Sequence, residues 1–205
     1  HSAFERRARQ LGFCRIAGVD EVGRGCLFGP VVAAAVILPE KHGLRGLNDS
    51  KQLDLEEREA LAPRIQERAI AWAVAEASVE EIERINILEA SRLAMKRAVE
   101  SLEPAADYLL VDAVAVNVTI EQRELIKGDA RCQSIAAASI VAKVYRDRLM
   151  QEFDARYPGY GIARHKGYGT PEHREALEQL GPTPLHRRTF LPVAQLSLFR
   201  TAGAR

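Results

Sequence analysis

The sequence predicts an α/β fold built around a mixed sheet, and two patterns carry this prediction. Three strand-like segments come early in the chain, joined first by a glycine-bearing turn and then by a helix. Strand-like and helical segments alternate after them, as they do where helices cover the faces of a sheet. The chain has 205 residues, enough for one domain with a sizeable core. We therefore expect a mixed five-stranded sheet flanked by helices, with a small helical and loop extension near the C-terminus.

The first half of the chain supplies three strands and two helices. A continuously apolar segment, PVVAAAVILP, predicts a strand with no solvent-facing side, and the preceding VGRGCLFG predicts a hairpin turn. The next segment has apolar residues at helical spacing, and its expected core contacts are Leu53, Leu55, Leu61 and Ile65. In order, the predicted elements are a strand over 15–20, a strand over 30–39, a helix over 50–69, a strand over 70–78 and a helix in two pieces over 79–102.

The second half of the chain alternates strand and helix. In the last helix Thr170 is the expected N-cap, Pro171 takes the first helical position and Gly181 follows the end. The long helix before it is rich in alanine, which allows close packing on a sheet. In order, the predicted elements are a buried strand over 106–113, a short strand over 123–130, a helix over 134–158 and a helix over 170–181.

Composition narrows the class of protein. Apolar residues make up 47% and charged residues 28% of the chain, a balance typical of globular proteins. No apolar run approaches the ~20 residues that cross a bilayer. The three cysteines, Cys14, Cys26 and Cys132, offer neither a zinc-ligand spacing nor a disulfide framework. We predict a cytoplasmic protein without membrane contact, and we assume a monomer.

Charge is distributed unevenly, although the formal net charge is only +1. Residues 40–103 carry 10 Lys and Arg against 14 Asp and Glu, a net charge of −4. Residues 127–191 carry 11 Lys and Arg against 7 Asp and Glu, a net charge of +4. A basic C-terminal half beside an acidic middle is compatible with a surface that faces phosphates.

Carboxylates follow three of the predicted strands. Asp20 and Glu21 end the first strand, Asp112 ends the fourth and Asp129 ends the fifth. Clustered carboxylates raise one another's pKa unless a cation lies among them, and oxygen ligands suit Mg²⁺ or Mn²⁺ rather than zinc. Successive strand side chains face opposite ways, so Glu21 joins the site only if the strand breaks after Asp20. The pattern predicts a site for two divalent ions.

Six motifs, in order, resemble ribonuclease HII, the bacterial type 2 ribonuclease H. They are GVDEVGRG with GPVVAAAVIL, then NDSKQL, LLVDA, KGD, AAASIVAKVYRDRLM and HKGYGT. The resemblance covers residues 14–193, which leaves an N-terminal extension over 1–13 and a tail over 194–205. It implies a ribonuclease-H-like fold and metal-dependent hydrolysis of RNA paired with DNA. It also implies incision on the 5′ side of single ribonucleotides embedded in DNA, which leaves 3′-hydroxyl and 5′-phosphate ends.

The resemblance also implies roles for single residues. The four catalytic and metal-binding acids fall on Asp20, Glu21, Asp112 and Asp129. The backbone of Gly23-Arg24-Gly25 is implied to read the 2′-hydroxyl that separates RNA from DNA, and Tyr168 to pack on the sugar beyond the scissile site. Asp147 is a rival for the fourth acid, and we assign it instead to ion pairing on the helix surface.

Further substrate contacts are expected on basic and polar side chains. Ser139, Lys143 and Arg146 lie on one stripe of the long helix and could hold phosphates, although an ion-paired edge is nearly as good an interpretation of Arg146. Lys51 and Lys166 are further phosphate candidates. His165 is expected at a phosphate or junction, with a structural histidine as the alternative. The remaining histidines are expected to have no catalytic role; they include His42, His173 and His186.

Three positions depart from the family pattern. Family members often have Pro-Leu-Ala after the glycine loop, where this chain has Cys26-Leu27-Phe28, and Phe28 could alter the outer face of that loop. The glycine usual after the third acid is Ala113, which puts the local backbone freedom in doubt.

Two other functions compete with hybrid cleavage. One is a different nuclease of the same broad fold, such as a resolvase-like enzyme, and the other is a hybrid-binding module with an inactive site. The tail adds a partner hypothesis, because QLSLF resembles the short motif by which bacterial proteins dock on the DNA sliding clamp. Its contact residues would be Gln195, Leu196, Leu198 and Phe199; the alternative is that these apolar side chains fold back on the domain.

Overall fold

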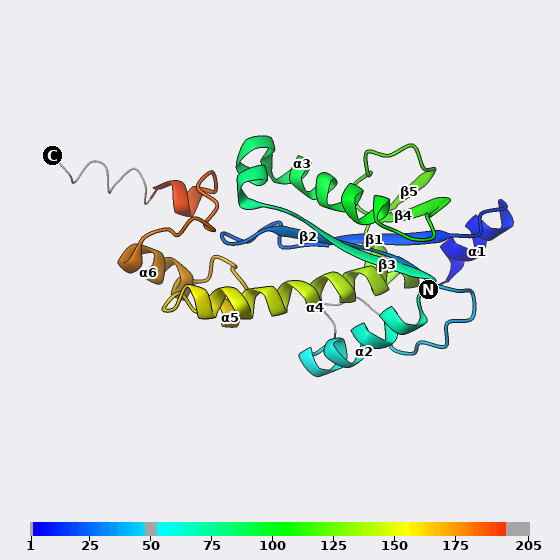
Figure 1. Ribbon diagram of the computed structural model, residues 1–205, viewed down its shortest axis with the longest axis horizontal. Helices are drawn as coiled ribbons and strands as arrows, with labels where there is room; N and C mark the ends of the chain where they lie inside the picture. Colours follow the sequence, from blue (N-terminus) through cyan, green and yellow to red (C-terminus); the bar gives the residue numbers. More distant parts are fainter. Residues whose placement is uncertain (1, 48–52, 196–205) are drawn as a thin grey trace.

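The computed structural model describes residues 2–47 and 53–195, and five strands form one mixed sheet in the order β3-β2-β1-β4-β5 (Figure 1). β1 pairs antiparallel with β2, and β2 pairs antiparallel with β3. β4 runs parallel to β1, and β5 runs parallel to β4. The strands are β1 (Ile16–Val22), β2 (Val31–Ile37), β3 (Ala71–Ala77), β4 (Tyr108–Asp112) and β5 (Gln122–Leu125).

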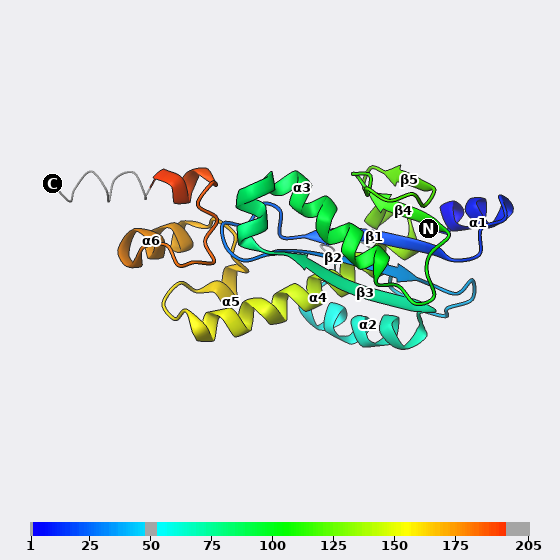
Figure 2. The ribbon, with the colours of Figure 1, turned by 45° about the horizontal axis from the view of Figure 1, so that its top comes forward.

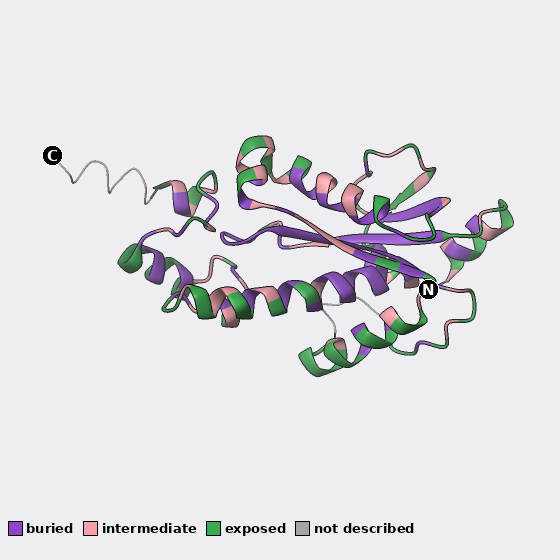
Figure 3. Cartoon of the chain, in the orientation of Figure 1, coloured by how far each residue is buried: buried purple, intermediate pink, exposed green. Residues whose placement is uncertain are grey.

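Helices cover both faces of the sheet (Figure 2). α3 (Val79–Glu100) packs on one face, where alanines of β1 and β2 meet Ile82, Ala94 and Met95. α2 (Leu55–Arg68) and α4 (Gln133–Arg156) pack on the other face. Every residue of β2 and most residues of β1 and β4 are buried between these layers (Figure 3). This burial explains why β2 is apolar along its whole length.

Gly18 brings β1 and α4 into direct backbone contact. A Cβ atom placed on Gly18 would come within 2.0 Å of the backbone carbon of Ser134, in the first turn of α4. No side chain fits in that space, so this glycine sets how closely the central strand and the long helix approach.

The ends of the molecule are built from shorter elements. α1 (Ala3–Gln10) lies at one end of the long axis and α6 (Pro171–Leu180) at the other, beyond α5 (Ile162–His165) (Figure 1). Glu5 of α1 is buried, and its carboxylate accepts hydrogen bonds from the backbone N–H and the hydroxyl of Ser134. The N-terminal segment therefore caps the start of α4.

Most predicted elements are confirmed. The hairpin, the mixed sheet, the break in α3 at Asn86 and the Thr170 cap of α6 are all present. The predicted strand over 123–130 is wrong in its second half: β5 ends at Leu125, and Gly128–Ala130 form a 3₁₀ helix, η1. Leu55 is wrong as a core contact, because it is 46% exposed at the start of α2.

None of the helices in the described part of the chain combines the length and the apolar character needed to cross a bilayer.

Candidate active site

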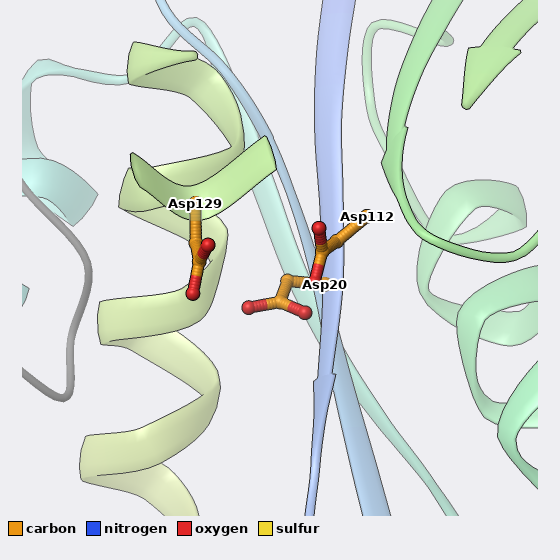
Figure 4. Close-up of side chains that lie close together, drawn as sticks. All are labelled: Asp20, Asp112 and Asp129. Carbon is orange, nitrogen blue, oxygen red and sulfur yellow. The ribbon is translucent and has the colours of Figure 1, made fainter. Parts of the chain in front are cut away.

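Two parallel strands and one helical turn bring three carboxylates together. Asp20 on β1 and Asp112 at the end of β4 project from the face of the sheet that α4 covers, the same face as Gly18. Asp129 comes from η1, just before α4 begins. Figure 4 shows the three side chains converging from these elements. One carboxylate oxygen from each residue lies within 4.8 Å of the others; we call Asp20, Asp112 and Asp129 the carboxylate cluster.

Backbone conformation fixes the loop that carries Asp129. Ala113 and Lys127 both have positive φ angles, 57° and 54°. The N–H of Gly128 donates to Asp112 Oδ1 at 2.7 Å, and the N–H of Ala113 donates to the carbonyl of Leu125. These bonds tie η1 to the end of β4, so Asp112 and Asp129 are held together. Ala113 takes this left-handed conformation at a modest strain, so the lack of the glycine expected from the resemblance does not prevent it.

Glu21 lies beside the carboxylate cluster without a break in the strand. β1 continues to Val22, and Asp20 and Glu21 pair with successive residues of β2. The expectation that the strand must break between them is wrong. Because Glu21 is near the strand end, its side chain still lines the same pocket as Asp20. Its Oε1 accepts from the guanidinium of Arg24 at 3.2 Å.

Electrostatics at the carboxylate cluster favour a bound cation. Burial raises the pKa of Asp20 well above its usual range, and the nearby charges of Glu21 and Asp112 raise it further. A hydrogen bond with Ser139 opposes this rise. Burial also raises the pKa of Glu21, with Arg24 acting against it. Such like-charge crowding is relieved when a divalent ion replaces the protons.

A pocket of about 130 Å³ joins the acids to several predicted substrate contacts. Its lining consists of Asp20, Glu21, Val22, Asp112, Ser139, Lys143 and Tyr168. Tyr168 is 43% exposed, so its ring stands at the edge of the pocket. Segments far apart in the sequence thus meet around one opening that is large enough for part of a nucleotide.

The glycine loop, residues 23–30, forms the wall beside this pocket. Gly23 has a φ angle of 93°, and a Cβ there would lie 2.3 Å from Arg146 Nε. Gly25 is exposed, and a Cβ there would meet no atom of the described residues within 4 Å. One glycine is required by packing, whereas the other leaves open space on the outer side. A backbone bridge between Cys26 and Tyr168 joins the loop to the Tyr168 segment.

The prediction that Arg146 contacts a phosphate is wrong. Its side chain is fully buried, and its guanidinium donates to the carbonyl oxygens of Pro30, Phe28 and Lys166. The spacing along α4 suggested one stripe for Ser139, Lys143 and Arg146, but α4 is covered near Arg146 by the glycine loop. Arg146 therefore supports that loop from within.

His165 is also wrong as a substrate contact, and its alternative as a structural histidine holds. It is buried, Nε2 donates to the carbonyl of Tyr160, and Nδ1 accepts from the N–H of Gly167. Both ring nitrogens are thus used by the backbone. Lys166 is half-buried, and its carbonyl accepts from Arg146.

Asp147 is held away from the carboxylate cluster by an ion pair. Its Oδ1 lies 2.7 Å from Lys143 Nζ, one helical turn earlier in α4. The expected pairing is present, but the expected surface position is wrong, because Asp147 is only 5% exposed. Lys143 also lines the pocket, so Asp147 helps to orient the Lys143 ammonium group at the edge of the pocket.

Phe28 does not alter the outer face of the glycine loop. It is fully buried and makes edge-to-face contacts with Phe153, Tyr157 and His186. The substitution therefore fills the core beneath the loop.

Sequence reasoning missed Arg187. Its guanidinium is fully buried and donates to three carbonyl oxygens of the glycine loop. The segment LHRRTF has no clear periodicity, and only the presence of two adjacent arginines before an aromatic residue marked it. Lys51, Leu196, Leu198 and Phe199 lie outside the described residues; Gln195 is described and exposed.

Solved structures with similar folds are ribonucleases. The ribonuclease H2 of Pyrococcus horikoshii OT3 superposes with a TM-score of 0.77 at 29% identity, covering 91% of this chain and 99% of that one. The structure of the PCNA–RNase HII complex from Archaeoglobus fulgidus gives a TM-score of 0.74 at 27% identity, covering 86% of this chain and 95% of that one. The fold and the carboxylate cluster together define a ribonuclease-H-like hydrolase.

Sequence comparison narrows this class. The sequence profile of the family Ribonuclease HII matches residues 17–193. The ribonuclease HII of Solibacter usitatus is 58% identical over 214 aligned residues, covering 99% of this chain and 94% of that protein. The chain belongs to the ribonuclease HII family and is a type 2 ribonuclease H, an endonuclease that hydrolyses phosphodiester bonds.

Proposed function

We propose that this enzyme cleaves the RNA strand of RNA–DNA hybrids and incises on the 5′ side of single ribonucleotides in duplex DNA. The products are a 3′-hydroxyl and a 5′-phosphate. The observation that carries the proposal is the carboxylate cluster, because two of its members, Asp20 and Asp112, line one pocket with Tyr168. This pocket adjoins the glycine loop. Groups suited to phosphodiester hydrolysis and groups suited to sugar recognition thus lie side by side.

The donor set fits divalent metal ions, Mg²⁺ or Mn²⁺. Asp20, Asp112 and Asp129 offer only oxygen atoms, their separation suits shared coordination, and burial disfavours their charges unless a cation is bound. These three residues would hold the ions, with Glu21 beside them. Bound as a pair, such ions supply an activated water and stabilise the leaving oxygen of a phosphodiester.

The remaining pocket residues bind and orient the substrate. Lys143, fixed by Asp147, presents its ammonium to a phosphate next to the scissile bond, and Ser139 holds Asp20 in position. Lys166 contributes a further phosphate contact at the outer edge. The tip of the glycine loop, Gly23-Arg24-Gly25, offers its backbone to the ribose 2′-hydroxyl.

One cleavage assay tests the proposed function. A DNA duplex with a single ribonucleotide should be incised 5′ of it in the presence of Mg²⁺ or Mn²⁺, and chelation should abolish incision. An all-DNA duplex of the same sequence should remain intact; cutting it equally would favour a resolvase-like activity. Binding of the hybrid without any cleavage would favour the inactive binding module.

Tyr168 is assigned to sugar recognition and has its own test. Tyr168→Ala should reduce incision at a lone ribonucleotide more than it reduces affinity for the duplex, since phosphate contacts dominate affinity. Equal losses of incision and affinity would make Tyr168 a structural aromatic. Tyr145→Phe is a matched control, because Tyr145 lies on α4, the helix that carries Lys143, and its hydroxyl donates to Glu76 of β3.

The proposal includes a protein partner, the DNA sliding clamp. Gln195 and the following residues resemble a clamp-docking motif, and the relative from Archaeoglobus fulgidus was solved in complex with PCNA. A few apolar anchors of about 2 kcal/mol or more each can dominate such an interface. Deleting residues 195–205 should leave cleavage of short oligonucleotides intact and eliminate clamp binding. Loss of folding or catalysis would mean that the tail belongs to the core. We place the enzyme in the cytoplasm as a monomer.

A further inference from the structure

Two buried arginines lie beneath the glycine loop and have no carboxylate partner among the described residues. Arg146 comes from α4 and Arg187 from the segment after α6, and both side chains are fully buried. Burying a guanidinium is costly unless its donors are satisfied. Here the acceptors are backbone carbonyl oxygens of the glycine loop and of Lys166.

Arg187 binds both ends of the glycine loop at once. Nη2 donates to the carbonyl of Gly23 at 2.7 Å, Nη1 to that of Arg24 at 2.8 Å, and Nε to that of Gly29 at 2.9 Å. The backbone N–H of Arg187 also donates to the carbonyl of Leu27 at 2.8 Å. The rigid, planar fork of a guanidinium can hold these carbonyls in one arrangement, which an ammonium cannot do.

This arrangement decides where the tip of the loop presents its N–H groups. In a trans peptide the carbonyl of one residue and the N–H of the next point in opposite directions. The peptides at Gly23-Arg24 and Arg24-Gly25 are trans. Because Arg187 draws both carbonyls inward, the N–H groups of Arg24 and Gly25 face outward. Gly25 is exposed there, with open space where a side chain would be.

The surroundings keep Arg187 charged and fixed. Burial lowers the pKa of Arg187 to about 10, which leaves the guanidinium protonated at neutral pH. The Phe190 ring stacks against it, with 5.1 Å from Cζ to the ring centroid. Arg146 lies alongside and connects the carbonyls of Phe28 and Lys166, so it links the glycine loop to the Tyr168 segment.

We propose that Arg187 is a positioning residue for substrate specificity, which orients the N–H groups of Arg24 and Gly25 toward the 2′-hydroxyl of the ribonucleotide. This inference rests on the proposed function, in which the loop reads the sugar. Arg187 itself touches no substrate. Its effect is therefore on the discrimination between ribose and deoxyribose, whereas the carboxylate cluster performs the hydrolysis.

The test compares Arg187→Lys and Arg187→Gln with the unaltered enzyme. Affinity is measured in Ca²⁺ for a duplex with one ribonucleotide and for the matching all-DNA duplex, and incision is measured in Mg²⁺. We expect the ratio of the two affinities to fall toward one and incision to fall about 100-fold, the cost of misplacing a group by about 1 Å. Affinity for the all-DNA duplex should change by less than about threefold, since phosphates dominate it.

Tyr160→Phe is the matched control for stability. It removes a buried hydroxyl that donates to the carbonyl of Gly181, and Tyr160 belongs to the apolar cluster that also contains Phe28 and Met150. The control should lower the melting temperature and leave the affinity ratio unchanged. The increase in melting temperature on addition of Mn²⁺ should be the same in all variants as in the unaltered enzyme, because the carboxylate cluster is separate from Arg187.

Two results would overturn the proposal. One is an Arg187 variant that keeps the full affinity ratio, or that loses no more of it than Tyr160→Phe does. The other is an NMR titration of the unaltered enzyme in which the Arg24 and Gly25 amides respond equally to both duplexes, a measurement that holds even if the variants fail to fold. Failure of the proposed function is recognised separately, because the unaltered enzyme would then show no preference for the ribonucleotide.

Discussion

The carboxylate cluster and the arginine pair beneath the glycine loop are opposite solutions to burying like charges side by side. Asp20, Asp112 and Asp129 face one another, and burial raises the pKa of Asp20, with the charges of Glu21 and Asp112 raising it further. Arg146 and Arg187 are more deeply buried, yet their donors bond carbonyl oxygens. The acids need a ligand to balance them, whereas the arginines are satisfied by the fold.

This difference shows how a ligand-binding site can be distinguished from a group of buried charges that only supports the fold. Clustered charge alone does not mark a ligand site, since both regions have it. What separates them is whether the polar atoms are saturated by the protein and whether they line an opening. By this criterion we propose the acids as the catalytic groups and the arginines as supports of the loop that would recognise the substrate.

Removing one acid from the carboxylate cluster should give the largest effect. Asp20→Asn or Asp112→Asn should lower the rate of incision by about 1,000-fold or more, the equivalent of about 4 kcal/mol of transition-state stabilisation. Cleavage in saturating Mg²⁺ measures this, and hybrid binding should survive. Near-normal turnover in either variant would contradict the assignment. Asp107→Asn, which removes a charge at the other end of β4, is the matched control.

The substitution Asp20→Asn should also raise the stability of the metal-free protein. A carboxyl whose pKa is raised by folding destabilises the native state as pH rises above its unfolded pKa, and the cost is complete above the folded pKa. Asp20→Asn removes this cost, so the melting temperature in chelator should rise at neutral pH, and the gain should shrink as pH falls toward 4. A lower melting temperature at neutral pH would mean that the cluster is not under electrostatic strain.

A comparison of two buried acids sharpens the contrast. Asp129→Asn should lower activity by about 100-fold or more, whereas Asp147→Asn, which only releases Lys143, should cost roughly tenfold or less. Asp147→Asn should instead destabilise the fold by about 2 kcal/mol, because it leaves Lys143 without its buried partner. Kinetics and denaturant unfolding of both variants test this ranking. The reverse ranking of activity would place the fourth acid on α4.

The last prediction concerns the two histidines below the glycine loop, which should make the stability of the fold depend on pH. His186 Nε2 lies 3.0 Å from His173 Nε2, and His173 Nδ1 donates to the carbonyl of Tyr168, so both rings must be neutral. Burial lowers the pKa of His173 to about 4 and that of His186 to about 3. Between these values and the unfolded value near 6.5, the unfolded chain binds more protons, so stability falls as pH falls.

The size of this loss is about 2 kcal/mol between pH 6.5 and pH 5 for each histidine. Urea unfolding across that range measures it, and His186→Gln should make the dependence shallower. An NMR titration in which His173 or His186 gains its proton near pH 6.5 would contradict the expectation. Added metal should not alter this pH dependence. The histidines, whose hydrogen bonds are made within the fold, are thereby distinguished from the carboxylate cluster, which depends on a ligand.

Local patterns predicted most of the fold, and strand ends predicted most of the site. Asp20 and Asp112 can be placed from sequence because each follows an apolar strand segment, although β1 itself continues to Val22. The RELIKGD segment has the local pattern of a strand to its end, but its last residues form a tight helical turn that depends on Lys127 in a left-handed conformation. Arg146 and Arg187 could not be assigned from sequence, since an arginine whose partners are distant carbonyls resembles a surface residue in local pattern.

Gly18 has a consequence for the precision of the site. It is two residues before Asp20 on the same face of β1, and it rests directly on the backbone of α4. The gap between the strand that carries Asp20 and the helix that carries Ser139 is thus set by main-chain atoms, which cannot rotate away as side chains do. A contact between main-chain atoms therefore sets the spacing within the carboxylate cluster. Even a methyl group at position 18 would increase this spacing by forcing β1 and α4 apart.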